Sequence, residues 1–240
     1  MVRLRNLLPF IFGALLSSPL STMAEGFGID VTRLIYPQGA ASIAVSVRNT
    51  QTTQPYLVQA TISPKADQRQ GKSPFSLTPP LFRLEPSSTH QIRIHGNTSS
   101  LPVDRESVFY FHATAIPASK GVDNQQPVTG VKGNVQFGVG NIIKLFYRPS
   151  GLTSSSVDAQ KGLRISRNGQ GLLVENPSPY FVSLASLSVA GQDVKLNTPD
   201  ALMIAPFGSH TYPVSVTQGV VSWKTITDQG GRNAFTYTLP

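Results

Sequence analysis

The 240-residue sequence contains no cysteine, which excludes disulfide bonds, cysteine nucleophiles and thiolate metal sites. It has a single tryptophan, and charged residues make up only 13% of it. No apolar run reaches the roughly 20 residues that a membrane-spanning helix needs, and Lys and Arg are scattered without a basic run. We therefore expect no stable membrane insertion and no nucleic-acid binding, and a fold that packing and sheet pairing alone must stabilise.

The first 24 residues have the layout of a secretory signal peptide. Arg3 and Arg5 form a basic start, and an apolar run from Leu7 to Leu16 follows. Thr22 and Ala24 then provide the small-x-small pair that precedes cleavage. We expect residues 1–24 to be removed and the mature chain to be exported as a soluble protein.

Segments with a period of two residues dominate the rest of the chain and predict strands. Gly and Pro, 20 and 19 in number, fall between these segments, and no stretch has a sustained helical period. Many short strands separated by turns are typical of antiparallel sandwiches. The polar stretch "RPSGLTSSS" at 148–156 divides them into two similar sets. The sequence thus predicts an all-β protein with two sandwich domains, at residues 25–148 and 152–240.

Motifs of catalysis and of cofactor or metal binding are incomplete. Gly71-Lys72-Ser73 ends like a phosphate-binding loop, but Ala66 stands where the first glycine is required. We interpret this segment as a polar hairpin loop. The four histidines show neither HExxH spacing nor a neighbouring GxSxG elbow. The sequence therefore indicates a protein that is not an enzyme and needs no cofactor or metal.

One predicted strand carries an apolar stripe without an obvious partner. Val135, Phe137 and Val139 alternate with Gln and Gly, and Val131 shares their parity. Strand alternation places Lys144 on the opposite face. From the residues alone, the stripe faces either the domain's own core or another protein chain.

An ordered set of longer signatures carries a resemblance over essentially the whole mature chain. These are "VTRLIYP" (31–37), "PYLVQA" (55–60), "PFSLTPPLFRLEP" (74–86), "LPVDRESVFYFHATAIP" (101–117), "IIKLFYRP" (142–149), "VENPSPYFVSL" (174–184), "MIAPFGS" (203–209) and "WKTITDQGG" (223–231). Together they closely resemble the periplasmic pilus chaperones of the chaperone–usher pathway, the PapD and FimC family. The resemblance implies two immunoglobulin-like β-sandwich domains in an L or boomerang arrangement, in the periplasm of a Gram-negative bacterium.

The resemblance also implies a function. Such chaperones hold fimbrial or pilin subunits by donor-strand complementation, prevent their aggregation and deliver them to an outer-membrane usher. It makes Val135, Phe137 and Val139, with Val131 as a fourth candidate, the donated residues. It makes Arg33 and Lys144 the anchor for the subunit's C-terminal carboxylate. An unoccupied stripe would favour self-association of the free chaperone.

A third set of residues matches family positions that form an ion-pair network between the domains: Glu106, Arg148 and Asp228. The chain departs from the family pattern at residues 118–134. The family branch with a long segment there usually carries a cysteine pair, and this chain has the long segment but no cysteine. The resemblance therefore does not distinguish a rod, a thin fibre or a capsule-like product. The alternative function, from another class, is a secreted two-domain sandwich that acts as an adhesin or carbohydrate-binding module.

Overall fold

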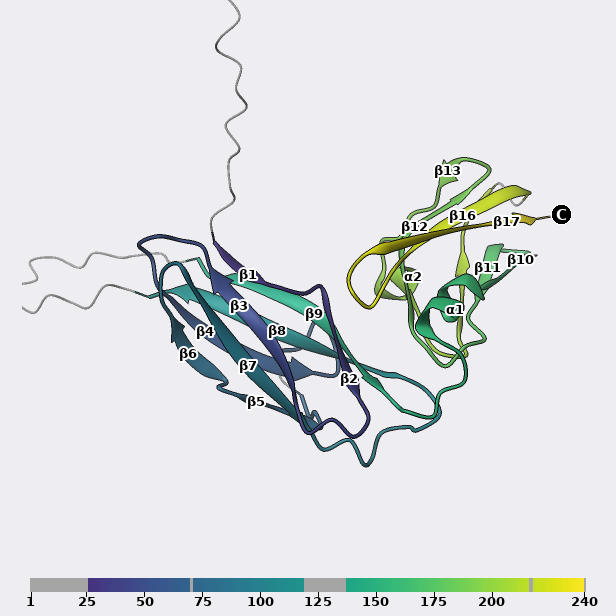
Figure 1. The fold of residues 1–240 in the computed structure, drawn as a ribbon. Coiled ribbons are helices and arrows are strands. Elements are labelled where there is room, and N and C mark those ends of the chain that lie inside the picture. The colour runs from purple at the N-terminus through teal and green to yellow at the C-terminus, as the bar shows by residue number, and fades with distance from the viewer. Residues whose placement is uncertain (1–25, 70, 119–136, 216–217, 240) are drawn as a thin grey trace, which may run out of the picture.

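The computed structural model describes residues 26–69, 71–118, 137–215 and 218–239. Over these ranges the chain forms two β-sandwiches joined by the segment between β9 and α1 (Figure 1). The predicted all-β class with immunoglobulin-like domains is confirmed. Val131 and Val135 lie outside the described residues, as does the predicted signal peptide.

The first sandwich consists of a four-stranded and a five-stranded sheet. The four-stranded sheet has the order β1 (Phe27–Ile29), β3 (Ile43–Asn49), β7 (Ser88–Gly96) and β5 (Phe75–Thr78). The five-stranded sheet has the order β2 (Arg33–Pro37), β9 (Val139–Arg148), β8 (Ser107–Pro117), β4 (Tyr56–Ser63) and β6 (Leu81–Leu84). All these pairs are antiparallel except β2 with β9, which run parallel.

Alternation of apolar residues along the strands forms the core between these sheets. In β4, Tyr56, Val58 and Ala60 are buried, whereas the intervening Leu57 and Gln59 are exposed. The buried residues from both sheets form one apolar cluster. This packing supports β9, the strand that carries the predicted anchor lysine.

The second sandwich pairs a three-stranded sheet with a five-stranded sheet. The former has the order β10 (Arg164–Asn168), β11 (Gly171–Glu175) and β15 (Ser209–Tyr212). The latter has the order β13 (Gln192–Asp193), β12 (Val182–Val189), β16 (Gly219–Ile226) and β17 (Arg232–Leu239), with β14 (Met203–Ile204) also paired to β12. A separate apolar cluster fills this sandwich.

Two short helices lie in the second half of the chain: α1 (Ser156–Lys161) and α2 (Pro199–Leu202). The Ser155 side chain caps α1 by accepting a hydrogen bond from the Asp158 N–H. Six residues are too few for a helical period to be visible in the sequence, which explains why α1 was not predicted. Within the ranges described, no helix has the length and apolar character needed to cross a membrane.

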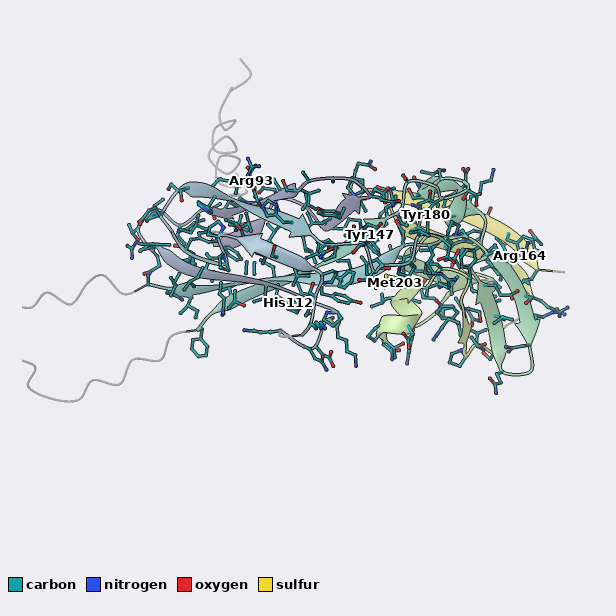
Figure 2. All side chains as sticks on the ribbon, turned by 90° about the horizontal axis from the view of Figure 1, so that it is seen from below. Arg93, His112, Tyr147, Arg164, Tyr180 and Met203 are labelled. Atoms are coloured by element: carbon teal, nitrogen blue, oxygen red, sulfur yellow. The ribbon has the colours of Figure 1, made fainter. Side chains whose placement is uncertain are left out.

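The interpretation of residues 66–73 as a hairpin loop was wrong. The loop joins β4 to β5, which belong to different sheets, so it crosses between the layers of the first sandwich. Its start is held by Ser63, whose Oγ donates to the Lys65 carbonyl and lies 2.7 Å from His112 Nε2. His112 occupies a buried sheet position on β8 in the first sandwich (Figure 2).

Candidate functional site

The two predicted anchor cations lie beside each other where the sandwiches meet. Arg33 begins β2, Lys144 lies on β9, and the parallel pairing places them directly opposite each other. Residues opposite each other on neighbouring strands point to the same face of a sheet. The fold therefore brings two positive charges from distant parts of the sequence to one place.

Arg33 is buried, with only 8% of its surface exposed. Its Nη1 donates to the Ile226 carbonyl of the second sandwich at 3.1 Å, and its guanidinium lies 5.7 Å from the Phe146 ring centroid. Its Nε is buried without a hydrogen-bond partner among the described residues. Burial lowers the pKa of Arg33, although Asp228 and Glu106 oppose this effect through their charges. Arg33 Nε–H is thus a hydrogen-bond donor that is shielded from water and available to a ligand.

Lys144 faces the second sandwich through Ser183 on β12, with 3.5 Å between Nζ and Oγ. Burial, and next the charge of Arg33, lower the pKa of Lys144 from 10.5 to about 8. No carboxylate lies within salt-bridge distance of Arg33 or Lys144 in the part of the chain that the structure describes. Two adjacent cations with no carboxylate in direct contact among the described residues form a site suited to an anion.

Glu106, Arg148 and Asp228 form a continuous ion-pair network between the sandwiches. Arg148 Nε donates to Glu106 Oε1 at 2.7 Å, and its Nη1 and Nη2 donate to the two carboxylate oxygens of Asp228 at 2.7 and 3.1 Å. Glu106 Oε2 accepts from the Phe181 N–H at 2.9 Å, and Ser156 Oγ donates to Asp228. The network therefore ties β9 to four segments: the start of β8, the start of α1, the start of β12 and the turn after β16.

The charges in this network are partly withdrawn from water. Burial raises the pKa of Glu106, and the charge of Arg148 limits this increase. Burial also acts to raise the pKa of Asp228, but its hydrogen bonds and its attraction to Arg148 lower it overall. The pKa of Arg148 is raised, because the two carboxylates outweigh the effect of its own burial. Arg148 thus compensates the charges of both carboxylates in a partly buried place.

Of the predicted donor residues, the structure describes Phe137 and Val139. Phe137 is 82% exposed and Val139 is 47% exposed, so neither belongs to the buried core of this chain. The β8–β9 register continues from Tyr147 to Val139 without a shift, which places Val139 on the face opposite Lys144.

The N-terminal half of β9 also has an open edge. Along the strand, β8 pairs with residues 139–147, whereas β2 pairs only with residues 144–148. Within the described ranges, residues 139–143 thus lack a strand on the β2 side. Unpaired strand edges of this kind accept another strand.

Comparison with known proteins identifies the family. Residues 26–153 match the model of the PapD N-terminal domain, described as a pili and flagellar-assembly chaperone. Residues 158–237 match that of the C-terminal domain of the pili assembly chaperone PapD. The chain belongs to the PapD family of pili assembly chaperones. The family resemblance inferred from the sequence signatures is confirmed.

Several members of the PapD family align over most of this chain. The probable fimbrial chaperone ElfD of Escherichia coli O157:H7 is 33% identical over 223 residues, which cover 90% of this chain and 89% of ElfD. The chaperone Caf1M of Yersinia pestis is 32% identical over 220 residues, covering 86% and 82% of the two chains. A chain in the structure of the Salmonella enterica SafA pilin with the SafB chaperone matches with a TM-score of 0.74 and 30% identity, covering 91% of this chain and 99% of that one.

Sequence reasoning missed several contacts of this PapD-family site. Phe146 and Phe181 meet across the two sandwiches with ring centroids 5.7 Å apart, and Arg105 lies 5.0 Å from the Phe207 ring centroid. Ser183 beside Lys144 was also missed. Each pair joins residues of different sandwiches, so no local pattern signals the contact. One local signal was present in the sequence: the two glycines of "DQGG" (228–231) indicate a tight turn.

Neither the tryptophan nor the cavity between β13 and β15 in the second sandwich offers an exposed aromatic ring for carbohydrate binding. The single tryptophan of the sequence, Trp223, is only 4% exposed, and its Nε1 donates to the Gln160 carbonyl at 3.0 Å. A cavity of about 610 Å³ lies between β13 and β15. Among the described residues that line it, the one aromatic carbocycle is the buried ring of Tyr212, whose hydroxyl donates to the Ala201 carbonyl. An exposed aromatic platform for a sugar is therefore absent from this cavity.

Proposed function

We propose that this chain is a non-enzymatic periplasmic chaperone that captures fimbrial subunits by donor-strand complementation and delivers them to an outer-membrane usher. One observation carries the proposal. The Arg33–Lys144 pair has no counter-ion among the described residues and lies on the same strand pair as an open edge with exposed apolar residues. Such an arrangement suits a ligand that is an extended chain ending in a carboxylate.

The capture step follows from sheet physics. A subunit sandwich that lacks its last strand exposes an apolar groove and two unpaired edges, both prone to aggregation. The backbone of β9 would complete its ladder, and Phe137 and Val139 would enter the groove together with Val131 and Val135. Full burial of each side chain contributes roughly 1.5–3 kcal/mol before the ordering costs of binding are subtracted.

The anchoring step would fix the register of this pairing. Arg33 and Lys144 would bind the subunit's C-terminal carboxylate through charge-assisted hydrogen bonds, each worth about 1.5–3 kcal/mol. Glu106, Arg148 and Asp228 would set the angle between the sandwiches and hence the position of the anchor. Release would need no nucleotide, because an incoming subunit's own strand would replace β9.

Export is part of the proposal. Residues 1–24 would direct the chain to the periplasm and be cleaved there, as their composition predicts. The free chaperone would protect its Phe137 stripe by self-association. Sedimentation of the purified mature chain with and without a subunit would measure this, with dissociation expected on subunit binding.

The test is expression of the full chain and purification of its mature form from the periplasm together with the products of neighbouring genes. We expect a stoichiometric complex with a small β-rich subunit. A second step titrates the chaperone with a synthetic peptide of that subunit's C-terminal strand, with a free carboxylate or an amide. Stronger binding of the free acid supports the anchor, whereas equal binding of both peptides contradicts it. A lone protein that binds glycans would support the adhesin alternative.

A further inference from the structure

A tight turn of the second sandwich touches the first sandwich directly beside the anchor. The turn joins β16 to β17 and is closed by hydrogen bonds between Thr227 N–H and the Gly231 carbonyl and between Gly230 N–H and the Thr227 carbonyl. Gly230 has a φ of +84°, in the left-handed region that favours glycine. A Cβ atom at Gly230 would lie only 2.5 Å from Thr32 Oγ1. The turn backbone therefore rests on the residue that precedes Arg33.

The same short segment makes two further contacts across the junction. The Ile226 carbonyl, at the end of β16, accepts the hydrogen bond from Arg33 Nη1 at 3.1 Å. Asp228 binds Arg148 through both carboxylate oxygens. Residues 226–230 thus contact Thr32, Arg33 and Arg148, which lie on or next to the two strands of the anchor.

Building on the proposed function, we infer that the Gly230 turn is the positioning element of the carboxylate anchor. Lys144 is placed by its strand, β9, which is paired on both sides at that point. Arg33 has a long side chain that lies beside the Phe146 ring, and among the described residues its guanidinium donates one hydrogen bond, to the Ile226 carbonyl. Capture of one carboxylate by two cations requires both donors within about 0.5 Å of the productive geometry. The close contact of Gly230 with Thr32 holds the turn, and with it Arg33, at that spacing.

Glycine is required at position 230 for two separable reasons, which a matched control distinguishes. In Gly230→Ala the alanine must adopt a φ that is unfavourable for residues with a side chain, and its Cβ collides with Thr32. Gly191, also in the second sandwich, has a similar φ of +79° but no heavy atom within 4 Å of an added Cβ. Gly191→Ala therefore reproduces the backbone strain without the collision. Thr32→Ala in the Gly230→Ala background removes Oγ1 and Cγ2 and leaves the Thr32 Cβ at an ordinary 3.5 Å.

The first measurement uses the free mature chain and needs no subunit. An NMR titration of the Lys144 side chain reports how close Arg33 lies and how well the site is shielded from water. We expect Gly230→Ala to raise the pKa of Lys144 from about 8 towards its ordinary 10.5, since displacement of the turn moves Arg33 away and admits water. Gly191→Ala leaves it unchanged, and Thr32→Ala/Gly230→Ala returns it towards 8. An unchanged Lys144 titration in Gly230→Ala overturns the inference.

The second measurement is the affinity for the two subunit peptides described above. We expect Gly230→Ala to lose at least tenfold in affinity for the free-acid peptide and little for the amide, with recovery in the double variant. Equal losses in Gly191→Ala and Gly230→Ala, or no recovery in the double variant, overturn the inference. If Gly230→Ala does not fold, recovery of folding in Thr32→Ala/Gly230→Ala shows that the collision with Thr32 is the cause. A double variant that also fails to fold contradicts the collision. Wild-type protein that binds acid and amide equally counts against the proposed function, while the Lys144 titration still decides the positioning.

Discussion

Arg33 and Lys144 are direct neighbours in the parallel pairing of β2 and β9, and both side chains are withdrawn from water. Two like charges side by side, one buried and one partly buried, raise the free energy of the empty site. An anion that binds between them removes this repulsion. The geometry thus favours occupancy by an anion, and the proposed occupant is the subunit's carboxylate.

Removal of either cation should abolish stable subunit complexes and leave the fold intact. We expect Arg33→Ala and Lys144→Ala each to weaken binding by about 1.5–3 kcal/mol, roughly 10- to 150-fold. Pull-downs and thermal melts would measure retention and stability. Arg48→Ala is the matched control, because Arg48 pairs with Asp30 on the exposed surface. Full retention of the subunit by both anchor variants would refute the anchoring role.

Subunit binding should weaken as the pH rises above 8. The free protein holds the pKa of Lys144 at about 8 through burial and the charge of Arg33. A bound carboxylate favours the charged lysine, so the complex takes up a proton when the pH exceeds the free-state pKa. Affinity should therefore be flat below pH 8 and fall by up to about tenfold per pH unit above it. Isothermal titration in buffers of different ionisation enthalpy would detect the proton uptake.

Lys144→Arg provides the control for this pH dependence, because arginine stays charged throughout the range. Its binding should be independent of pH between about 7 and 10, because the arginine pKa lies well above this range. A wild-type affinity that is equally flat would show that Lys144 does not participate.

Phe137→Glu should prevent subunit capture with little change in the stability of the chaperone. Phe137 is 82% exposed, so the new carboxylate stays hydrated in the free protein. In the complex it would lose water without a partner, at a cost of several kcal/mol. Thermal melts and pull-downs would separate these effects. Val103→Glu, at another exposed apolar position, is the control. A much lower melting temperature of Phe137→Glu would place the stripe inside this chain's own core.

Arg148→Ala should destabilise the protein strongly. It leaves Glu106 buried and Asp228 half-buried without their shared cation, and loss of one partner from a buried pair costs about 3–5 kcal/mol. Denaturant unfolding would measure the loss, and small-angle scattering would report the angle between the sandwiches. Arg164→Ala, at an exposed position on β10, should change neither quantity. An unchanged scattering profile in Arg148→Ala would show that the ion-pair network does not set the angle between the sandwiches.

Alternation along the strands made the fold class predictable. In β9 it also predicted that Lys144 faces away from Val139, as the register confirms. The ion-pair partners followed only from the family resemblance, because residues 106, 148 and 228 are far apart in the sequence. Ser183 could not be foreseen, since its contact with Lys144 depends on how two separately folded sandwiches meet. The roles of all these residues in subunit binding stay predictions.

The proposed anchor and the open edge lie on one strand, so β9 fixes the distance between the bound subunit's carboxylate and the residues paired with the open edge. Val139 and Lys144 are five residues apart, or roughly 17 Å at the rise of an extended strand. A subunit strand whose last carboxylate is held at Lys144 runs parallel to β9, so its side chains opposite Val139 are set by counting back from its end. One additional C-terminal residue would turn every one of those side chains to the wrong face. Two additional residues would restore the alternation, so subunit tails lengthened by one residue should be rejected more strongly than tails lengthened by two.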